Sequence, residues 1–489
     1  MTQPVVGISG FSIYLPPFRV DLRAWSEWTG ANWDKIRSVV GTGFRLLGPG
    51  QSVYTMAANA VLQLLRNYDI DPGRVRYLAL GTESSTDNSA GAIIIKGMVD
   101  SALQANGMPP LSRHCEVPEF KHACLGGVYG LKNALRFLLA DADDDSVAIV
   151  VSADKALYRQ GSSGEPTQGA GAVAVLLERN PRIARIDLRE AGTASDYRGV
   201  DFRKPLINRN GTGASPEFVD IPVFNGKYST SCYIDECQHA LEDMYARRGL
   251  KAGEYLRGLR AAFLHRPYRR MPESGWSMAY LFALAGGDDS DHQELQVYCS
   301  KAGVDPQALL AELRQPPRLS EFASRERIGE EVFPLSLAVL REFRRDPAFQ
   351  DIVKAKLRLG AEAMCELGNL YTGALPAWVA AGLTEAVETG EELAGEEILM
   401  IGYGSGDAAD AMPMHIVPGW QEAARAIRFA EALQPVVELN HEQYQAIRER
   451  GEAAQLDYQP HGEFIVERVG AESAASFQDA GIEYYRYVQ

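Results

Sequence analysis

The sequence lacks long apolar runs and has few cysteines. Its longest apolar stretches, such as 147–151 and 170–177, fall far short of the roughly 20 residues that a membrane-spanning helix needs. Six cysteines in 489 residues, with no CxxC pair, argue against a disulfide framework and against a zinc site of paired cysteines. The first ten residues have no basic stretch followed by an apolar core, so no secretory signal is expected. These absences predict a cytoplasmic protein with free thiols.

Positively charged residues are also fewer than negatively charged ones. Lys and Arg number 49 against 64 Asp and Glu, a net charge of -15. Such a surface repels nucleic acids and anionic membranes, so neither is expected as a partner. An anionic ligand would need a local basic pocket. With 46% hydrophobic and 23% charged residues, the chain has ordinary globular composition, and its length exceeds one domain of about 150 residues.

Strands alternate with helices along the first 190 residues. Helical periodicity covers 53–68 and 125–139, whereas short apolar runs predict strands at 5–13, 75–81, 115–120, 146–153 and 170–177. This alternation predicts an α/β sheet with helices on both faces. We expect an N-terminal half over 1–190 and a C-terminal half over 191–489. In the C-terminal half the sequence predicts strands at 259–264, 398–403 and 463–469 and a helix that ends at Gly249. The segment 335–383 is predicted to be mostly helical, with an interruption at 367–373. The polar stretch at about 286–330 is interpreted as a surface insertion.

The strongest local signal is a cysteine among small residues, in Lys121-His122-Ala123-Cys124-Leu125-Gly126-Gly127. Cys124 directly precedes a predicted helix, where backbone N–H groups and the helix dipole favour a thiolate and lower the thiol pKa. That makes Cys124 a candidate nucleophile. The alternative is a buried cysteine that acts as a small hydrophobe.

Two further candidates follow predicted strands. Glu83, in Gly81-Thr82-Glu83-Ser84-Ser85, lies where catalytic groups gather in α/β sheets, and partial desolvation would raise its pKa enough for proton transfer at neutral pH. The alternative is a helix cap or a solvated acid. His265 follows an apolar strand and precedes Pro267; it is either a donor toward a carbonyl group or a core histidine. The adjoining arginines 266, 269 and 270 are a candidate basic patch or a solvated charged face.

A glycine-rich turn, Gly402-Tyr403-Gly404-Ser405-Gly406-Asp407, follows the strand at 398–403. It has neither the Lys-Ser/Thr ending of a P-loop nor the GxGxxG pattern, so nucleotide binding gains little support. Its N–H groups could hold an oxyanion, or it could be a plain tight turn. A nucleophilic cysteine, an acid/base glutamate, a histidine and this turn together match carbon–carbon bond formation through a thioester.

In this order the motifs resemble those of the hydroxymethylglutaryl-CoA synthase family, a branch of the thiolase superfamily. The resemblance runs from Gly7-Ile8-Ser9-Gly10 to the turn near residue 404. Besides the motifs above, it includes 164–174 (GEPTQGAGAVA), 201–205 (DFRKP), 226–229 (GKYS), Cys232-Tyr233, 263–268 (FLHRPY) and 368–373 (GNLYTG). So many blocks in one order exceed a chance match.

The resemblance implies a duplicated five-layered αβαβα thiolase-like fold, a homodimer, and an active site between the halves. It implies that Cys124 takes acetyl from acetyl-CoA, that Glu83 removes a proton from the acetyl-enzyme, and that His265 positions acetoacetyl-CoA. Neither a metal nor a bound organic cofactor is expected. By the same resemblance the substrate-binding residues are Asn369 and Tyr158 at the acceptor, Ser405 and Gly404 at the thioester oxygen, Arg270 at the CoA phosphates, and Thr167 and Asp201 in two other matched blocks.

The chain also departs from the family pattern. It has Leu125 where tyrosine usually follows the nucleophile, Ala90 where lysine is usual, and Arg270 in place of a lysine. The motif at 121–124 also resembles relatives in polyketide β-branching, which take acetyl from an acyl carrier protein, and another β-ketoacyl acceptor stays open. A degradative thiolase would need a second cysteine where Ser405 stands, and a ketoacyl synthase would not need Glu83. An inactive thiolase-like scaffold would need none of the three catalytic residues.

Overall fold

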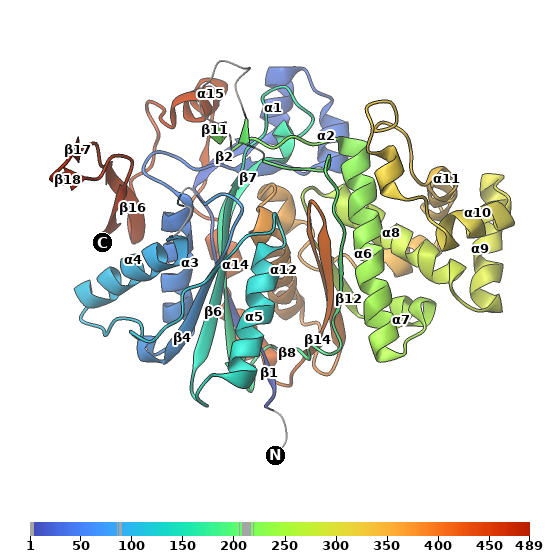
Figure 1. Cartoon of the computed structure of the whole chain (residues 1–489), viewed down its shortest axis with the longest axis horizontal. Helices are drawn as coiled ribbons and strands as arrows, with labels where there is room; N and C mark the ends of the chain where they lie inside the picture. Colours follow the sequence, from blue (N-terminus) through green and yellow to red (C-terminus); the bar gives the residue numbers. More distant parts are fainter. Residues whose placement is uncertain (1–3, 86, 88–89, 205, 208–216, 219) are drawn as a thin grey trace.

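The computed structural model describes residues 4–85, 87, 90–204, 206–207, 217–218 and 220–489. Five layers follow one another from left to right in Figure 1: outer helices, a sheet, two central helices, a second sheet region and a further set of outer helices. The two sheet regions belong to one continuous sheet, because the short strand β8 (Ala184–Arg185) pairs with both β1 and β14. The α/β alternation read from the sequence is confirmed.

The N-terminal sheet region has the strand order β5-β4-β6-β7-β1. Strands β6 and β7 are buried almost throughout, as expected for apolar runs covered on both faces. Helices α3 and α4 cover the outer face. The bounds are β1 Val6–Tyr14, β4 Val75–Gly81, β5 Glu119–Phe120, β6 Val147–Ala156, β7 Gly169–Arg179, α3 Val53–Asn67 and α4 Gly91–Ala105.

The C-terminal sheet region is built on the hairpin of β13 and β14, flanked by β12 and β9. Helix α6 packs on β9 and β14, and α8 packs on α6. The bounds are β9 Gly192–Ser195, β12 Ala261–Leu264, β13 Glu397–Gly404, β14 Ala408–Ile416, α6 Gly226–Arg248, α7 Ala252–Gly258 and α8 Arg270–Ala285.

Helices α5 (Gly126–Ala140) and α12 (Ala374–Thr389) form the central layer between the two sheet regions. Glycines let α5 approach its neighbours closely: a Cβ on Gly130 would meet the Val150 side chain of β6 at 3.1 Å. An ion pair between Lys132 of α5 and Asp410 of β14 joins the two halves across the centre, and both side chains are buried.

Smaller elements surround this body. A sheet β15-β2-β3 lies beside α1 and α2, and a C-terminal hairpin pairs β16 with β19. Their bounds are β2 Phe18–Asp21, β3 Gly43–Arg45, β15 Val437–Glu438, β16 Glu463–Val469, β17 Ser473–Ala474, β18 Phe477–Gln478, β19 Glu483–Val488, α1 Leu22–Thr29, α2 Trp33–Val39, α13 Trp420–Arg425, α14 Phe429–Ala432 and α15 His441–Arg450. A further two-strand pair joins β10 (Leu206–Ile207) and β11 (Glu217–Phe218).

The predicted strands at 75–81 and 463–469 and the helix end at Gly249 are confirmed. The segment 115–120 is a strand only at its last two residues. The polar stretch at 286–330 contains two helices, α9 (Asp289–Ala302) and α10 (Pro306–Arg314), which bury Leu295 and Leu309 against the core. The segment 335–383 is less helical than expected, because α11 (Pro334–Phe343) ends well before α12 begins. Within the described residues no helix could cross a lipid bilayer.

Candidate active site

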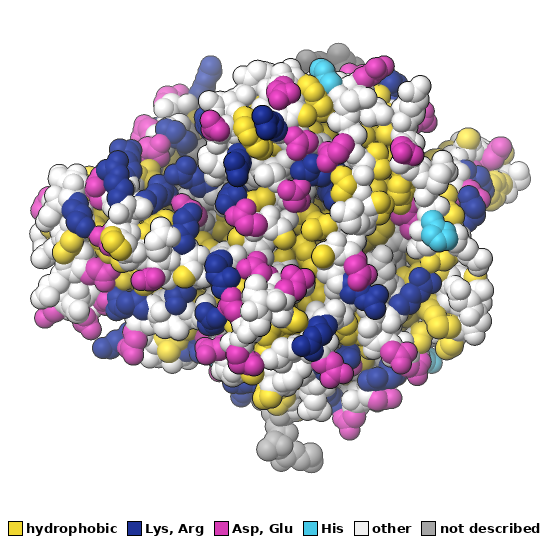
Figure 2. Space-filling model, turned by 180° about the vertical axis from the view of Figure 1, so that it is seen from behind, with side chains coloured by type: hydrophobic (Ala, Val, Ile, Leu, Met, Phe, Trp, Pro, Cys, Tyr) yellow, Lys and Arg dark blue, Asp and Glu magenta, His cyan; other side chains and the backbone are white. Residues whose placement is uncertain are grey.

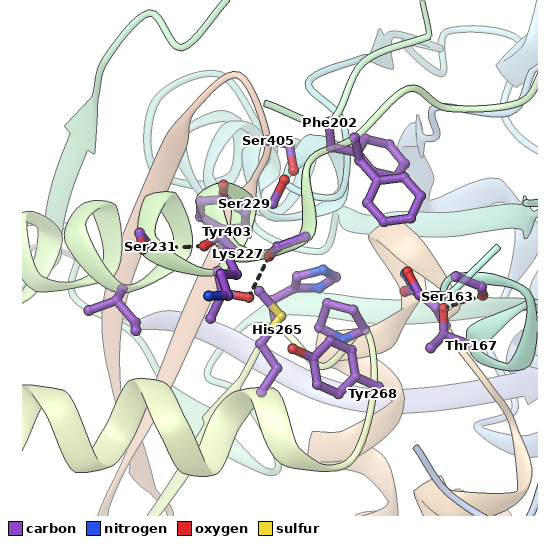
Figure 3. Close-up of a pocket in the computed structure, with 18 of the residues that line it drawn as sticks. Ser163, Thr167, Phe202, Lys227, Ser229, Ser231, His265, Tyr268, Tyr403 and Ser405 are labelled. Atoms are coloured by element: carbon purple, nitrogen blue, oxygen red, sulfur yellow. Dashed lines mark hydrogen bonds between the residues drawn. The ribbon is translucent and has the colours of Figure 1, made fainter. Parts of the chain in front are cut away.

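A cavity of about 650 Å³ opens beside the amino end of α5. Six predicted site residues line it, and Figure 3 shows three of them, Thr167, His265 and Ser405, facing the same space. The six are Cys124, Tyr158, Thr167, His265, Asn369 and Ser405. The other four, Glu83, Asp201, Gly404 and Arg270, do not line the cavity. Apolar and aromatic side chains make up much of the remaining wall, together with a few polar and charged groups, which is typical of a small-molecule site.

Cys124 lies in a tight turn that ends one residue before α5 begins. Its neighbour Ala123 has φ +41°, a left-handed conformation that L-residues rarely adopt. Glycines allow the turn to pack: a Cβ on Gly404 would lie 2.5 Å from the carbonyl oxygen of His122. Gly404 therefore makes room for the nucleophile turn, and its role in substrate binding stays a prediction.

The expected low pKa of Cys124 is wrong. Burial, followed by the nearby carboxyl groups of Glu83 and Asp154, raises the thiol pKa well above its ordinary value. The helix amino terminus does not outweigh these effects, since α5 begins only at Gly126 and the cavity offers little solvation. The nucleophile is therefore held as a neutral thiol.

Glu83 follows β4 and is 8% exposed, so it is not a solvated loop acid. Its backbone N–H donates to Asp154 Oδ1 at 2.9 Å, which fixes the turn. Burial raises the pKa of Glu83 to about 8, and the Lys204 ammonium, with Nζ 3.8 Å from Glu83 Oε1, opposes that rise. The predicted upward shift is confirmed, and the resulting carboxylate is a stronger base than an exposed glutamate.

Two charged residues near Glu83 were missed from the sequence. Asp154 accepts hydrogen bonds from Thr82 and from the backbone of Thr372, so it ties β4, β6 and the segment before α12 together. An acidic residue inside the apolar run of β6 was the available signal. Lys204 also binds Asp220 at 2.7 Å and lies in the DFRKP block of the family resemblance.

His265 follows β12, and its backbone is bound on both sides. Its N–H donates to Ile401 at 2.8 Å, and its carbonyl oxygen accepts from the Tyr233 hydroxyl at 3.1 Å. The imidazole faces the cavity and stacks on Tyr403, with ring centroids 6.4 Å apart. Burial lowers the pKa of His265 to about 3, so the ring is a neutral donor at physiological pH.

Cys124 packs against an aromatic cluster. Tyr158, Phe202, Phe224 and Tyr371 contact one another edge-on or tilted, with centroids 5.7 to 6.5 Å apart. Asn369 holds two of them, because its Nδ2 donates to the Tyr158 hydroxyl at 3.4 Å and its Oδ1 accepts from the Tyr371 N–H at 2.9 Å. Three of these rings were not predicted; Tyr371 lies inside the GNLYTG block, next but one to Asn369.

The basic patch expected at 266–270 does not face the cavity. Arg266 is buried, with its guanidinium 5.1 Å from the Trp378 ring centroid and donating to the sulfur of Cys365. Arg269 binds Glu362. Arg270 is exposed at the start of α8. Two lysines that the sequence did not single out, Lys35 and Lys227, line the cavity instead.

Acidic and cysteine side chains gather behind the glycine-rich turn. Two groups of side chains here place atoms that can coordinate a metal ion within 4.8 Å of one another. The first group is Asp201, Cys232 and Asp407, and the second is Asp196, Asp235, Glu236 and His239. The guanidinium of Arg198 lies against both, with Nε 3.5 Å from Asp407 and Nη2 2.6 Å from Asp235. A permanent cation thus already occupies this region. All six cysteines are free thiols.

The comparisons with known proteins agree with this geometry. Residues 3–181 match the family model of the hydroxymethylglutaryl-coenzyme A synthase N terminus. The chain is 27% identical over 445 residues to the hydroxymethylglutaryl-CoA synthase of Enterococcus faecalis, covering 90% of this chain and 91% of the relative. It is 24% identical over 421 residues to that of Haloferax volcanii, covering 85% of each. The N-terminal part of the chain thus matches the hydroxymethylglutaryl-CoA synthase family, and the chain is similar to these synthases over most of its length.

Solved structures of such synthases have the same fold. MvaS in complex with 3-hydroxy-3-methylglutaryl coenzyme A superimposes with a TM-score of 0.77 at 22% identity over 100% of both chains. The curacin-pathway HMG synthase in complex with acetyl donor-ACP gives 0.68 at 18% identity, covering 99% of this chain and 100% of that one. The predicted thiolase-like α/β fold is confirmed. The similarity to curated synthases over most of the chain indicates an enzyme.

Proposed function

We propose that this enzyme is a hydroxymethylglutaryl-CoA synthase, which condenses acetyl-CoA with acetoacetyl-CoA through an acetylated Cys124. The observation that carries the proposal is the convergence of Cys124, His265 and Asn369 on one apolar cavity, with the carboxyl group of Glu83 buried close to the sulfur. The proposed chemistry needs only acyl thioesters, water and side chains of this chain.

In the first step the sulfur of Cys124 attacks the acetyl carbonyl, and CoA leaves with the proton that the thiol gives up. The raised thiol pKa makes the thiol a poor resting nucleophile, so deprotonation and attack are expected to occur together once the substrate fills the cavity. We place the developing oxyanion at the backbone of the turn that holds Ser405, because N–H donors aimed at that charge supply the largest stabilisation.

In the second step Glu83, as a carboxylate, removes a proton from the acetyl methyl group. The enolate carbon bonds to the ketone carbon of acetoacetyl-CoA, and Glu83 returns its proton to the new alkoxide. Neutral His265 donates toward the acceptor ketone, Asn369 and Tyr158 hold the acceptor, and Thr167 lines its side of the cavity. Water then hydrolyses the Cys124 thioester and releases hydroxymethylglutaryl-CoA.

Arg270 is proposed to act at the rim of the site. It adjoins Met271, which lines the cavity. The pKa of Arg344 is lowered by burial first and then by the nearby positive charges of Arg270 and Arg341, so the three arginines lie close together. Figure 2 shows Lys and Arg side chains gathered on the side formed by α8 to α11. We infer that these arginines attract the phosphates of the thioester carrier. The alternative carrier is an acyl carrier protein, which the similar curacin-pathway synthase binds.

Intact-protein mass spectrometry tests the proposal. Acetyl-CoA is expected to add one acetyl group to the wild type and none to Cys124→Ser, and acetoacetyl-CoA is then expected to yield hydroxymethylglutaryl-CoA. Acetylation only from an acetylated carrier protein would favour the carrier-dependent alternative. Acetylation without that product would indicate another β-ketoacyl acceptor, and no acetylation from either donor would overturn the proposal.

We also propose that the protein is a homodimer, on the basis of the family. Its free cysteines support a cytoplasmic location. Light scattering during gel filtration should give twice the mass of the chain, and a monomeric mass would contradict this.

A further inference from the structure

Two acidic side chains lie buried directly behind the glycine-rich turn. Asp201 and Asp407 are each 2% exposed. The Tyr403 hydroxyl lies within hydrogen-bond distance of both, 3.1 Å from Asp201 Oδ2 and 2.9 Å from Asp407 Oδ1. A hydroxyl carries a single proton, so it cannot satisfy two carboxylates. The other oxygens, Asp201 Oδ1 and Asp407 Oδ2, are buried without a hydrogen-bond partner.

The surrounding charges do not compensate two anions. Arg198 is the nearby cation, but its Nη2 is committed to Asp196, Asp235 and Glu236, and its Nε lies 3.5 Å from Asp407 Oδ2 without a hydrogen bond. Titratable groups from three elements surround Asp407. Tyr403 comes from β13, and Asp196, Arg198 and Asp201 come from the loop after β9. Helix α6 contributes Tyr228, Cys232, Asp235, Glu236 and Cys237. Two ionised carboxylates this close in a buried site repel each other strongly, and sharing one proton removes the repulsion.

The pair is connected to the cavity through Tyr403. Tyr403 lines the cavity, stacks on the ring of His265 and lies two residues before Ser405. Figure 3 shows Tyr403, His265 and Ser405 around one space. Asp407 also accepts a hydrogen bond from the N–H of Gly406, so it ties the turn to the tyrosine that supports His265.

We propose that Asp201 and Asp407 share a single proton and act as a positioning pair, which fixes Tyr403 and the turn at 404–407 so that His265 and the backbone near Ser405 meet the substrate. This rests on the proposed function, in which His265 and that turn contact the acyl groups. Burial and the proximity of Asp201 raise the pKa of Asp407 to about 9, which supports a proton on the pair at neutral pH.

Two variants of similar size separate the shared proton from simple packing. Asp407→Asn keeps a neutral hydrogen-bonding group and should retain kcat within about threefold, since an amide can replace a carboxylic acid as donor and acceptor. Asp407→Leu fills the space without hydrogen bonds and should lower kcat at least tenfold, with little change in KM for acetyl-CoA. Equal activity of the two variants, or loss of activity in both, would overturn the proposal.

A measurement without substrate keeps this test separate from the proposed function. The infrared difference spectrum of wild type minus Asp407→Asn at pH 7 should contain the carbonyl stretch of a protonated carboxylic acid, and that band should disappear above about pH 9. Its absence at pH 7 would refute the shared proton even in an active enzyme. An inactive wild type that retains the band would instead refute the proposed reaction.

Discussion

At the residue scale, the site depends on how burial divides the titratable groups. Burial raises the pKa of Glu83 to about 8, whereas it lowers the pKa of His265 to about 3. Desolvation disfavours the charged form in both, so the acid becomes a better base and the histidine stays neutral. The two residues therefore take different roles: Glu83 is suited to moving protons and His265 to donating a hydrogen bond.

Replacing Glu83 with Gln should separate the half-reactions. Acetylation of Cys124 is expected to continue, because it does not require the base, while condensation should slow by about 10²- to 10⁴-fold, the usual contribution of a general base. Mass spectrometry of the acetyl-enzyme and steady-state product formation measure the two steps. Equal loss of both steps would show that Glu83 acts mainly before condensation.

Lys204 should set the pH range of the reaction. Its ammonium lowers the pKa of Glu83, so Lys204→Met should raise that pKa. Because the base must be deprotonated, activity rises with pH through the Glu83 pKa, and this limb should move to higher pH in the variant. At pH 7 we expect a loss of about three- to tenfold.

Lys204→Arg, which keeps the charge, should restore most of the profile. A Met variant whose pH profile coincides with that of the wild type would rule out this role for Lys204.

At the element scale, close backbone contacts place the nucleophile. A Cβ on Gly81, the last residue of β4, would lie 2.5 Å from the backbone of Gly127 in the first turn of α5. Strand β4 and helix α5 therefore fit together only because a side chain is missing there. The spacing of Glu83 and Cys124, which follow β4 and precede α5, depends on that contact.

Gly81→Ala should destabilise the protein by about 1 to 3 kcal/mol, the usual cost of overpacking, and slow acetylation of Cys124. Gly97→Ala is the matched control, because no atom lies within 4 Å of a Cβ at this exposed position of α4. Alanine should stabilise that helix by about 0.5 to 1 kcal/mol. Urea unfolding measures both, and equal effects would contradict the packing argument.

At the scale of the whole molecule, the two halves meet around the central helices. The ion pair of Lys132 and Asp410 crosses that interface, and its burial means that neither charge can be solvated if its partner is lost. Such pairs add little net stability, but breaking one is costly.

Lys132→Met should lower the free energy of unfolding by about 3 to 5 kcal/mol, because Asp410 is left buried and unpaired. The double variant Lys132→Met with Asp410→Leu should recover much of that loss. Arg23→Ala, which removes a largely exposed ion pair with Glu27, should change the free energy by less than about 1 kcal/mol. Denaturant unfolding compares all three, and a double variant as unstable as the single one would contradict this account.

The sequence by itself determined the α/β class, most strand positions and the catalytic candidates, because these follow from local periodicity and from motifs read in order. Glu83, Cys124 and His265 could be named in this way. Only the tertiary structure placed Asp154 and Lys204 near Glu83, turned Arg266 away from the cavity and raised the pKa of Cys124. Those features depend on burial and on contacts between residues far apart in the chain, and desolvation acts only once the folded chain excludes water.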